Sequence, residues 1–399
     1  MAHDFTPRRR PQNYTISRRA FLIGCSVAAS PLLTPVTFAA AKGDNRLVVI
    51  VLRGAMDGID VFRPIGDPDY ASLRPTLAAD AATSPDLNGF FALHPAAAAL
   101  LPLWQAGELG FAQAVATPYR QGRSHFIGQD ALENGTGGAD GALTPGHDGW
   151  LNRALGQIKG ATAETAVSVG QQRLLILDGA QDTQHWFPVN ESPLSAQGQQ
   201  LMDAVYAADP LLAEPYAQAQ GLATLTAGDK IPRNGLAYQQ LGTYVAEQLT
   251  GPSRIASFSL GGWDTHHGQT RIMTDQLTAL SDVLLAMKTG LAANWGTTLV
   301  LAMTEFGRTA RENGSGGTDH GTGGMMIAAG GALNGKRVFG TWPGLGDGDL
   351  LAERDLMPTG DVRAYAGWAL RSMFGVEASA LQSVVFPGLD LGADPGLLL

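Results

Sequence analysis

The sequence has 399 residues, of which 16% are charged and 45% hydrophobic, and its formal net charge is −9 at pH 7. This acidic balance argues against nucleic acid as a partner, because binding to phosphates depends on clustered Lys and Arg residues. The low charged fraction and the 51 glycines are typical of a large, well-buried α/β domain with many loops.

Residues 1–41 have the pattern of an export signal. Arg18 and Arg19 precede an apolar run, and small residues at 38–41 form a cleavage zone. The arginine pair indicates the twin-arginine route, with the export machinery as a partner and a periplasmic or secreted location. Cys25 lies so close to the arginine pair that lipidation is the less favoured alternative.

The remaining residues, 42–399, form the predicted folded domain. They contain 22 basic and 35 acidic residues, a formal net charge of −13, and no cysteine. Disulfides and thiolate metal sites are therefore excluded, so any metal ligands must be His or carboxylate side chains. This part of the sequence has no apolar run long enough to span a bilayer.

Apolar runs alternate with helical patterns along this domain. The alternation predicts an α/β fold with a doubly wound, mainly parallel sheet flanked by helices and joined by right-handed crossovers. Between 157 and 233 the pattern weakens, which indicates a cap or helical insertion. The predicted strands are 47–52, 110–116, 174–177, 255–260, 298–303 and 325–329, and the predicted helices are 95–105, 125–134, 235–249, 269–291 and 361–373.

Acidic and His residues follow two of the predicted strands. Because open α/β sheets bind ligands at the carboxyl ends of their strands, we expect one shared metal site there. Carboxylate and imidazole groups suit a divalent cation, with Zn, Mn, Mg and Ca left open. The alternative for each Asp is a helix cap that orients a neighbouring His. The candidate ligands are Asp264 with His266 or His267, and Glu305, Asp319 and His320.

Four further residues complete the predicted site. Asp57 follows the first strand and is a candidate metal ligand, although Asp57-Gly58 also fits a plain turn. Ser124 starts a predicted helix, where its hydroxyl is either an N-cap or a nucleophile activated by a nearby metal. Arg123 and Arg308 are candidates for binding substrate oxygens, with pairing to a neighbouring carboxylate as the alternative for Arg308.

Several blocks of the sequence together resemble one bacterial family. They are Leu52 to Gly58, Ser124 to Phe126 with Gln129, Asp264 to His266 with Gln269, Glu305 to Thr309, and Asp319 to Gly321. This set resembles the secreted domain-of-unknown-function family 1501, within the wider alkaline phosphatase and sulfatase superfamily. The resemblance implies an alkaline phosphatase-like fold, paired divalent metals at the strand ends, and ester hydrolysis through a Ser, Thr or modified Cys nucleophile.

Two functions are compatible with these patterns. The first is a periplasmic metal-dependent hydrolase of phosphate or sulfate esters, whose substrate is a small anionic ester. In this hypothesis Ser124 attacks the ester, Arg123 and Arg308 steady its oxygens, and the carboxylate and His residues hold the ions. The second is a non-catalytic envelope or assembly protein that retains the fold, since a fold does not entail an activity.

Export is expected to depend on Arg18 and Arg19, because a twin-arginine signal is an address that a receptor recognises rather than a membrane anchor. Arg18→Lys with Arg19→Lys should leave the precursor in the cytoplasm, as measured by cell fractionation and immunoblotting. The matched control, Arg8→Lys with Arg9→Lys, preserves the same charge and should be exported normally. Normal periplasmic accumulation of the first variant would contradict the assignment.

Overall fold

The structure is a computed structural model that describes most of the folded domain. Contacts divide the chain after Ala39, and every described residue belongs to the second unit, Ala40–Leu399. The predicted export signal, 1–41, lies outside the described residues. The structure describes residues 44–399 except 121, 139–140, 142, 144–145, 171–172 and 187–234.

The first strand, β1 (Arg46–Leu52), is buried along its whole length. It pairs in parallel with β7 (Ile255–Leu260) on one side and with β8 (Thr298–Met303) on the other. Because successive side chains of a strand point to opposite faces, neighbours such as Val48 and Val49 enter two different hydrophobic cores. The continuous apolar run in the sequence therefore reflects burial on both faces of the sheet.

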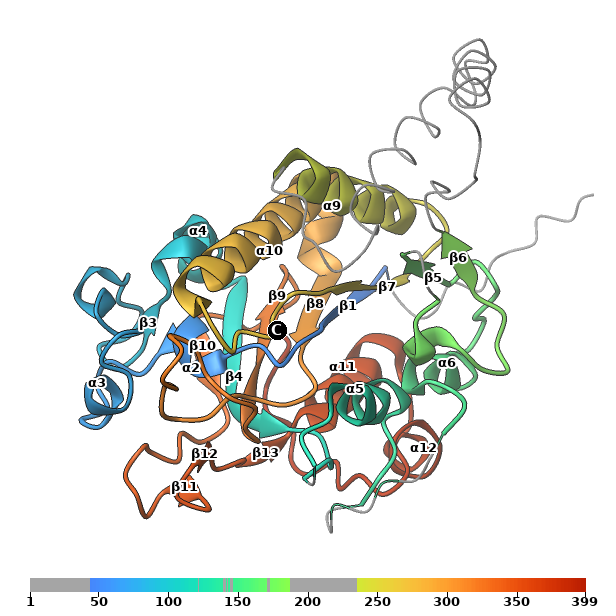
Figure 1. The fold of residues 1–399 in the computed structure, drawn as a ribbon. Helices are drawn as coiled ribbons and strands as arrows, with labels where there is room; N and C mark the ends of the chain where they lie inside the picture. The colour runs from blue at the N-terminus through green and yellow to red at the C-terminus, as the bar shows by residue number, and fades with distance from the viewer. Residues whose placement is uncertain are drawn as a thin grey trace, which may run out of the picture. The chain divides into compact units, whose positions relative to one another are not determined.

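The main sheet is mixed but mostly parallel (Figure 1). Its other strands are β4 (Leu109–Ala116), β5 (Ala166–Val169), β6 (Gln184–Trp186), β9 (Gly324–Ala329), β10 (Arg337–Phe339) and β13 (Gly360–Asp361). The order across the sheet is β10-β4-β9-β8-β1-β7-β5-β6, and β13 also pairs with β4. β9 is antiparallel to both of its neighbours, whereas the other pairs in this sheet are parallel.

Helices cover both faces of the sheet (Figure 1). On one face, α9 (Gly235–Thr250) and α10 (Gln269–Leu291) contribute to the first core. On the other face, α5 (His125–Asn134), α6 (Trp150–Leu155) and α11 (Val362–Phe374) contribute to the second. None of the helices in the described part of the chain is long and apolar enough to cross a membrane.

The remaining elements are short. They are α2 (Gly58–Val61), β2 (Phe62–Arg63), α3 (Tyr70–Leu73), η1 (Ala81–Thr83), β3 (Ala92–Leu93), η2 (Pro95–Leu100), α4 (Leu101–Gln105), η3 (Leu175–Leu177), η4 (Ala292–Thr297), β11 (Leu350–Leu351), β12 (Asp355–Leu356), α12 (Ala378–Ala380) and η5 (Leu381–Val385).

The predicted fold class is confirmed, and α5, β7, α10 and β8 have the predicted bounds. The predicted helix 95–105 is instead a 3₁₀ helix, η2, followed by the α-helix α4. The change falls just before Pro102, which has no N–H to continue a helical hydrogen-bond pattern. The predicted strand 174–177 is wrong, because Leu175–Leu177 forms the 3₁₀ helix η3.

The first part of the predicted insertion belongs to the main sheet. Within 157–186, β5 pairs with β7 and β6 pairs with β5, both in parallel. These strands extend the sheet beyond β7, so this part of the chain is not a cap. The rest of the predicted insertion, 187–233, lies outside the described residues.

The topology brings several loops to one edge of the sheet. β1, β4, β7 and β8 run in the same direction, so the segments that follow them leave from the same edge. Since β9 runs in the opposite direction, its amino end lies at that edge as well. The residues just before β9, which include His320, therefore lie near the segments that follow β1, β7 and β8.

Gly307 permits a close contact between two of these loops. A Cβ atom at this position would lie 1.8 Å from the carbonyl oxygen of Gly323, a backbone atom that cannot rotate away. We expect Gly307→Ala to lower the free energy of unfolding by roughly 1–3 kcal/mol, the usual cost of overpacking, as measured by urea denaturation. Gly348→Ala, where a Cβ would meet no atom within 4 Å, is the control. Equal stability of the two variants would contradict this account.

Candidate metal centre

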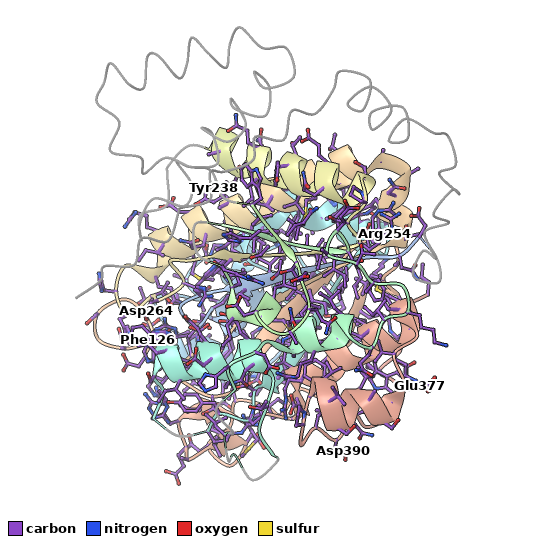
Figure 2. All side chains as sticks on the ribbon, turned by 90° about the vertical axis from the view of Figure 1, so that its right-hand side faces the viewer. Phe126, Tyr238, Arg254, Asp264, Glu377 and Asp390 are labelled. Carbon is purple, nitrogen blue, oxygen red and sulfur yellow. The ribbon has the colours of Figure 1, made fainter. Side chains whose placement is uncertain are left out.

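The loop after β7 places Asp264 and His266 beside the segment that follows β1. Gly54 allows this approach, since a Cβ on it would lie 2.5 Å from the backbone nitrogen of Asp264. Gly54 also has a φ of 117°, a conformation that favours glycine. Figure 2 shows Asp264 and Phe126, the residue after His125, near the same edge of the domain. Backbone packing thus sets the position of the Asp264 carboxylate.

Three imidazoles are held through their Nδ1 atoms. His125 Nδ1 lies 2.8 Å from Glu305 Oε1, and His266 Nδ1 lies 3.1 Å from Asp319 Oδ1. His320 Nδ1 lies 2.9 Å from the carbonyl oxygen of Arg123. Because a carbonyl or ionised carboxylate oxygen only accepts hydrogen bonds, each Nδ1 carries the proton. A ring held in this way offers an Nε2 lone pair whenever it is neutral.

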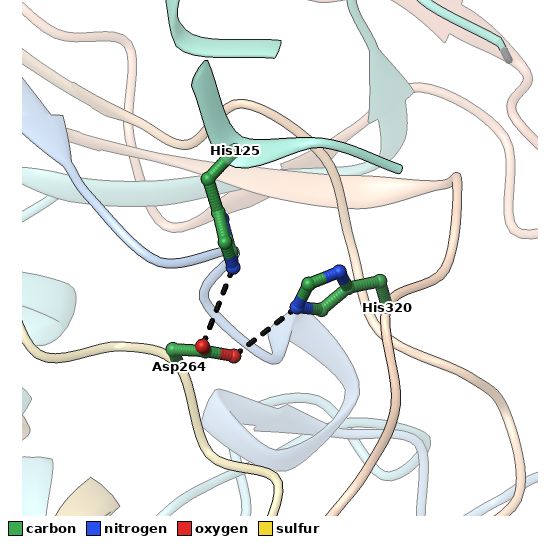
Figure 3. Close-up of side chains that lie close together, drawn as sticks. All are labelled: His125, Asp264 and His320. Atoms are coloured by element: carbon green, nitrogen blue, oxygen red, sulfur yellow. Dashed lines mark hydrogen bonds and ion pairs between the residues drawn. The ribbon is translucent and has the colours of Figure 1, made fainter. Parts of the chain in front are cut away.

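All three Nε2 atoms lie near the Asp264 carboxylate. His266 Nε2 and His320 Nε2 are 3.1 Å and 3.2 Å from Asp264 Oδ1, and 2.9 Å from each other. His125 Nε2 approaches Asp264 Oδ2 at 3.4 Å. In Figure 3 the rings of His125 and His320 reach the same carboxylate from two sides. The ligand atoms of His125, Asp264 and His320 all lie within 4.8 Å of one another.

These atoms fit the requirements of a divalent cation. With bonds of 2.0–2.2 Å to His nitrogen and carboxylate oxygen, a tetrahedral zinc ion separates its ligand atoms by about 3.3–3.6 Å. Four of the separations are close to that range: those among His266 Nε2, His320 Nε2 and Asp264 Oδ1, and that between His125 Nε2 and Asp264 Oδ2, are 2.9–3.4 Å. Ligating His residues also characteristically donate their other ring N–H to an oxygen acceptor, as all three do here.

The electrostatics of the cluster favour a cation. Hydrogen bonds that His125 donates to Asp264 and Glu305 raise the pKa of His125 to about 9. Burial opposes ionisation of Asp264, but hydrogen bonds from His125, His320 and Arg308 hold the pKa of this carboxyl far below its usual range. The carboxylate is therefore ionised at neutral pH, and a bound metal would take the place of a proton at His125 Nε2.

Glu305, a predicted ligand, supports His125 in this structure. Its buried carboxylate accepts hydrogen bonds from the backbone N–H of Gly54 at 2.9 Å and from Gln129 at 3.1 Å, in addition to the His125 contact. Burial opposes its ionisation, but the bonds from His125 and Gln129 keep the pKa of Glu305 below its usual range. Glu305 thus holds the ring of His125 through Nδ1, so that Nε2 faces Asp264.

Asp319, also a predicted ligand, lies on the outer side of His266. Its Oδ1 contacts His266 Nδ1 and accepts a hydrogen bond from Asn313 at 3.2 Å. These two hydrogen bonds hold the pKa of Asp319 below its usual range. Its observed contact is therefore with the back of the imidazole, while His266 Nε2 faces His320. Of the two alternatives after Asp264, His266 is in the cluster and His267 is exposed.

Asp57 lies in a separate buried network. Its Oδ1 accepts from the first backbone N–H groups of α2, so it caps that helix. Its Oδ2 accepts from Arg74 and Gln269, both at 2.7 Å, and from Thr318 at 3.3 Å. Burial opposes its ionisation, but the Arg74 guanidinium lowers the pKa of Asp57. Both oxygens are thus occupied by protein donors in this structure, an arrangement that fits the turn alternative, while its role as a metal ligand stays a prediction.

The Arg308 guanidinium is buried and engaged by the protein. It donates to the carbonyl oxygens of Gly54, Ala55, Trp263 and Thr318 and, at 2.6 Å, to Asp264 Oδ1. The predicted alternative, pairing with a carboxylate, is the arrangement that the structure shows. Arg308 therefore positions Asp264, and its nitrogens are not directed at a substrate.

Arg123 and Ser124 lie at the start of α5. The Arg123 guanidinium pairs through Nη2 with Asp355 at 2.9 Å, and its carbonyl oxygen orients His320. Its role in holding substrate oxygens stays a prediction. Ser124 occupies the N-cap position but makes no side-chain capping bond. Its hydroxyl forms no hydrogen bond with any described residue and directly precedes His125.

His125 was not among the predicted site residues, although the sequence offered one signal for it. It belongs to the Ser-His-Phe block that contributed to the family resemblance. In the structure, stacking of its ring on Phe306, with centroids 5.3 Å apart, and the Glu305 contact bring it to Asp264. Both contacts join positions about 180 residues apart, which local sequence patterns do not reveal.

The fold and this cluster define an α/β protein with a candidate His and carboxylate metal centre. The chain belongs to the family described as protein of unknown function (DUF1501), whose model matches residues 119–384. This match confirms the family resemblance. No curated protein matches the sequence.

Solved structures give distant matches. They include Ps i-CgsB in complex with k-i-k-neocarrahexaose (10% identity, 85% of this chain and 74% of that chain, TM-score 0.40). A protein in the alkaline phosphatase superfamily from Vibrio parahaemolyticus has 12% identity over 71% and 60% of the two chains, with a TM-score of 0.34. Alkaline phosphatase from the Antarctic bacterium TAB5 has 10% identity over 72% and 90%, with a TM-score of 0.31.

Removing one imidazole should weaken metal binding. Loss of a residue that only hydrogen-bonds to a metal ligand commonly lowers metal affinity 10–100-fold. Loss of a ligand itself, in His320→Ala, should therefore reduce zinc affinity by at least about tenfold, measured by competition with a chelating dye. His267→Ala, an exposed neighbour of His266, is the matched control and should retain wild-type affinity. Equal affinities of the two variants would contradict the proposed centre.

Proposed function

We propose that this protein is an exported, metal-dependent hydrolase of phosphate or sulfate esters. The observation that carries the proposal is the convergence of three Nε2 atoms on one carboxylate, with each ring anchored through Nδ1. A set of preorganised ligands at the carboxyl edge of an α/β sheet is the usual setting for ligand binding and chemistry in such folds. The family resemblance points to the same reaction class.

His125, Asp264, His266 and His320 would hold the cation. Three imidazoles favour zinc or a similar transition metal over Mg²⁺ or Ca²⁺, which prefer oxygen ligands. A metal bound here would supply Lewis acid chemistry, polarising an ester oxygen or lowering the pKa of a bound hydroxyl group. Glu305, Asp319 and the Arg123 carbonyl group would keep the three rings in their orientation.

Ser124 is the proposed nucleophile. It directly precedes His125, and its hydroxyl makes no hydrogen bond with any described residue, so a cap does not occupy it. It stands at the amino end of α5, a helix of 10 residues, where partial positive charge favours a serine oxygen anion. Attack by Ser124 Oγ would form an O–P or O–S bond and release the alcohol, and water would then free the serine.

A second candidate function is a non-catalytic envelope or assembly protein with a structural metal. The specific observation in its favour is that the guanidinium groups of Arg123 and Arg308 are paired with protein acceptors. Neither of these two guanidinium groups is therefore wholly free to hold the oxygens of a tetrahedral anion. Charge stabilisation in the proposed reaction would come chiefly from the cation and the α5 amino end.

The export route belongs to this proposal because the signal lies outside the described residues. Twin-arginine signals direct proteins by receptor recognition, and the route carries proteins that are already folded. We propose that the metal centre is assembled before export to the periplasm. Its ligands come from distant segments of the chain, so it forms only in the folded domain.

Ser124→Ala tests the proposed reaction. Loss of the hydroxyl should lower the turnover of p-nitrophenyl phosphate or sulfate by at least about 100-fold, because the covalent step is lost. Stability should fall by less than about 1 kcal/mol, the usual cost of removing an N-cap, since this hydroxyl makes no capping bond. Ser379→Ala, at the exposed start of α12, is the control for both measurements. Unchanged turnover in Ser124→Ala would exclude Ser124 as the nucleophile.

A further inference from the structure

A polar pocket of about 220 Å³ adjoins the metal centre. It is smaller than the roughly 300–1,000 Å³ of pockets for drug-sized ligands, so it has room for one ring-sized group. Among the described residues that line it, Leu73 and Leu350 are the apolar members, and the others are polar or charged. The pocket therefore favours a ligand that makes hydrogen bonds over an aromatic or aliphatic one.

Two residues form the wall between this pocket and the cluster. Asp319 lines the pocket and also contacts His266 Nδ1 at 3.1 Å. Asn313 lines it too, and its amide nitrogen donates to Asp319 Oδ1 at 3.2 Å and to the carbonyl oxygen of His266 at 2.9 Å. A group in the pocket would thus lie one imidazole away from the Nε2 atoms that would hold the cation.

Charged groups of both signs in the pocket are available for a ligand. The side chains of Arg311, Asp347 and Glu353 are exposed and make no hydrogen bond or ion pair with any described residue. Arg354 uses Nη1 for the carbonyl oxygen of His320 and for Asp355, which leaves its other nitrogens available. Glu312, by contrast, is fully used by the backbone N–H groups of Thr76 and Leu77.

We propose that the pocket binds a neutral, hydroxyl-rich ring of the saccharide class. A second anionic group would face the carboxylates of Asp319, Asp347 and Glu353, whereas an ammonium group would face two guanidinium groups. Adjacent hydroxyls can donate to a carboxylate and accept from a guanidinium at the same time. Binding of the ring does not depend on the proposed function.

Direct binding tests the pocket without any turnover. The zinc-loaded protein is titrated with methyl glucoside, methyl galactoside and methyl mannoside, and binding is followed by ligand-observed NMR. At least one hexoside should bind, and Asp347→Asn with Glu353→Gln should weaken that binding at least tenfold. Glu377→Gln, an exposed residue that lies away from Asp264 in Figure 2, is the matched control and should bind normally. The inference is overturned by the absence of binding at 10 mM of each hexoside, about tenfold above the weak limit of 1 mM affinity.

Discussion

The arrangement of the site depends on one buried cation, the guanidinium of Arg308. A buried charge is tolerated when it is paired and fully hydrogen-bonded, and this one donates to the segments that carry Gly54, Asp264 and Thr318. Those segments follow β1, follow β7 and precede β9. Because one planar group with fixed donor directions bonds to all three, their separation is set before any ligand binds. The positions of Asp264 and His320 follow from that separation.

The central sheet and its long helices could be predicted from the sequence because they are buried on wide apolar surfaces. β1 enters two cores, so its whole run is apolar, and α10 repeats buried residues at helical spacing. The strands β5 and β6, at one edge of the sheet, could not be predicted from the sequence for a related reason. β6 (Gln184–Trp186) is only partly buried, and a short strand with little apolar surface leaves no periodic signal. β5 (Ala166–Val169) is buried but only four residues long, so residues 157–186 carry no strand pattern that separates them from an insertion.

The site was predictable where a strand end carries its own signal. Asp264, His266 and His320 stand beside glycine-rich turns at strand ends, and the structure brings these three together. Asp57 stands at a similar place, but its role depends on Arg74 and on Gln269, the latter 212 positions away. Local sequence patterns do not reveal long-range contacts. They therefore cannot distinguish a carboxylate whose oxygens both accept hydrogen bonds from protein donors from one that is free to bind a metal.

The charge of the cluster gives a further reason to expect a divalent cation. Three carboxylates, from Asp264, Glu305 and Asp319, each contact at least one of the imidazoles. The guanidinium of Arg308 adds one positive charge beside Asp264. At neutral pH the raised pKa of His125 keeps that ring protonated, so the group has one negative charge in excess. When the rings of His266 and His320 are neutral with Nδ1 protonated, their Nε2 atoms lie 2.9 Å apart without a proton between them, an arrangement in which two lone pairs repel. A divalent cation that displaced the His125 proton would satisfy these lone pairs and balance the two negative charges that the neutral rings then leave. Metal binding therefore accounts for the three anchored rings as well as for the charge of the cluster.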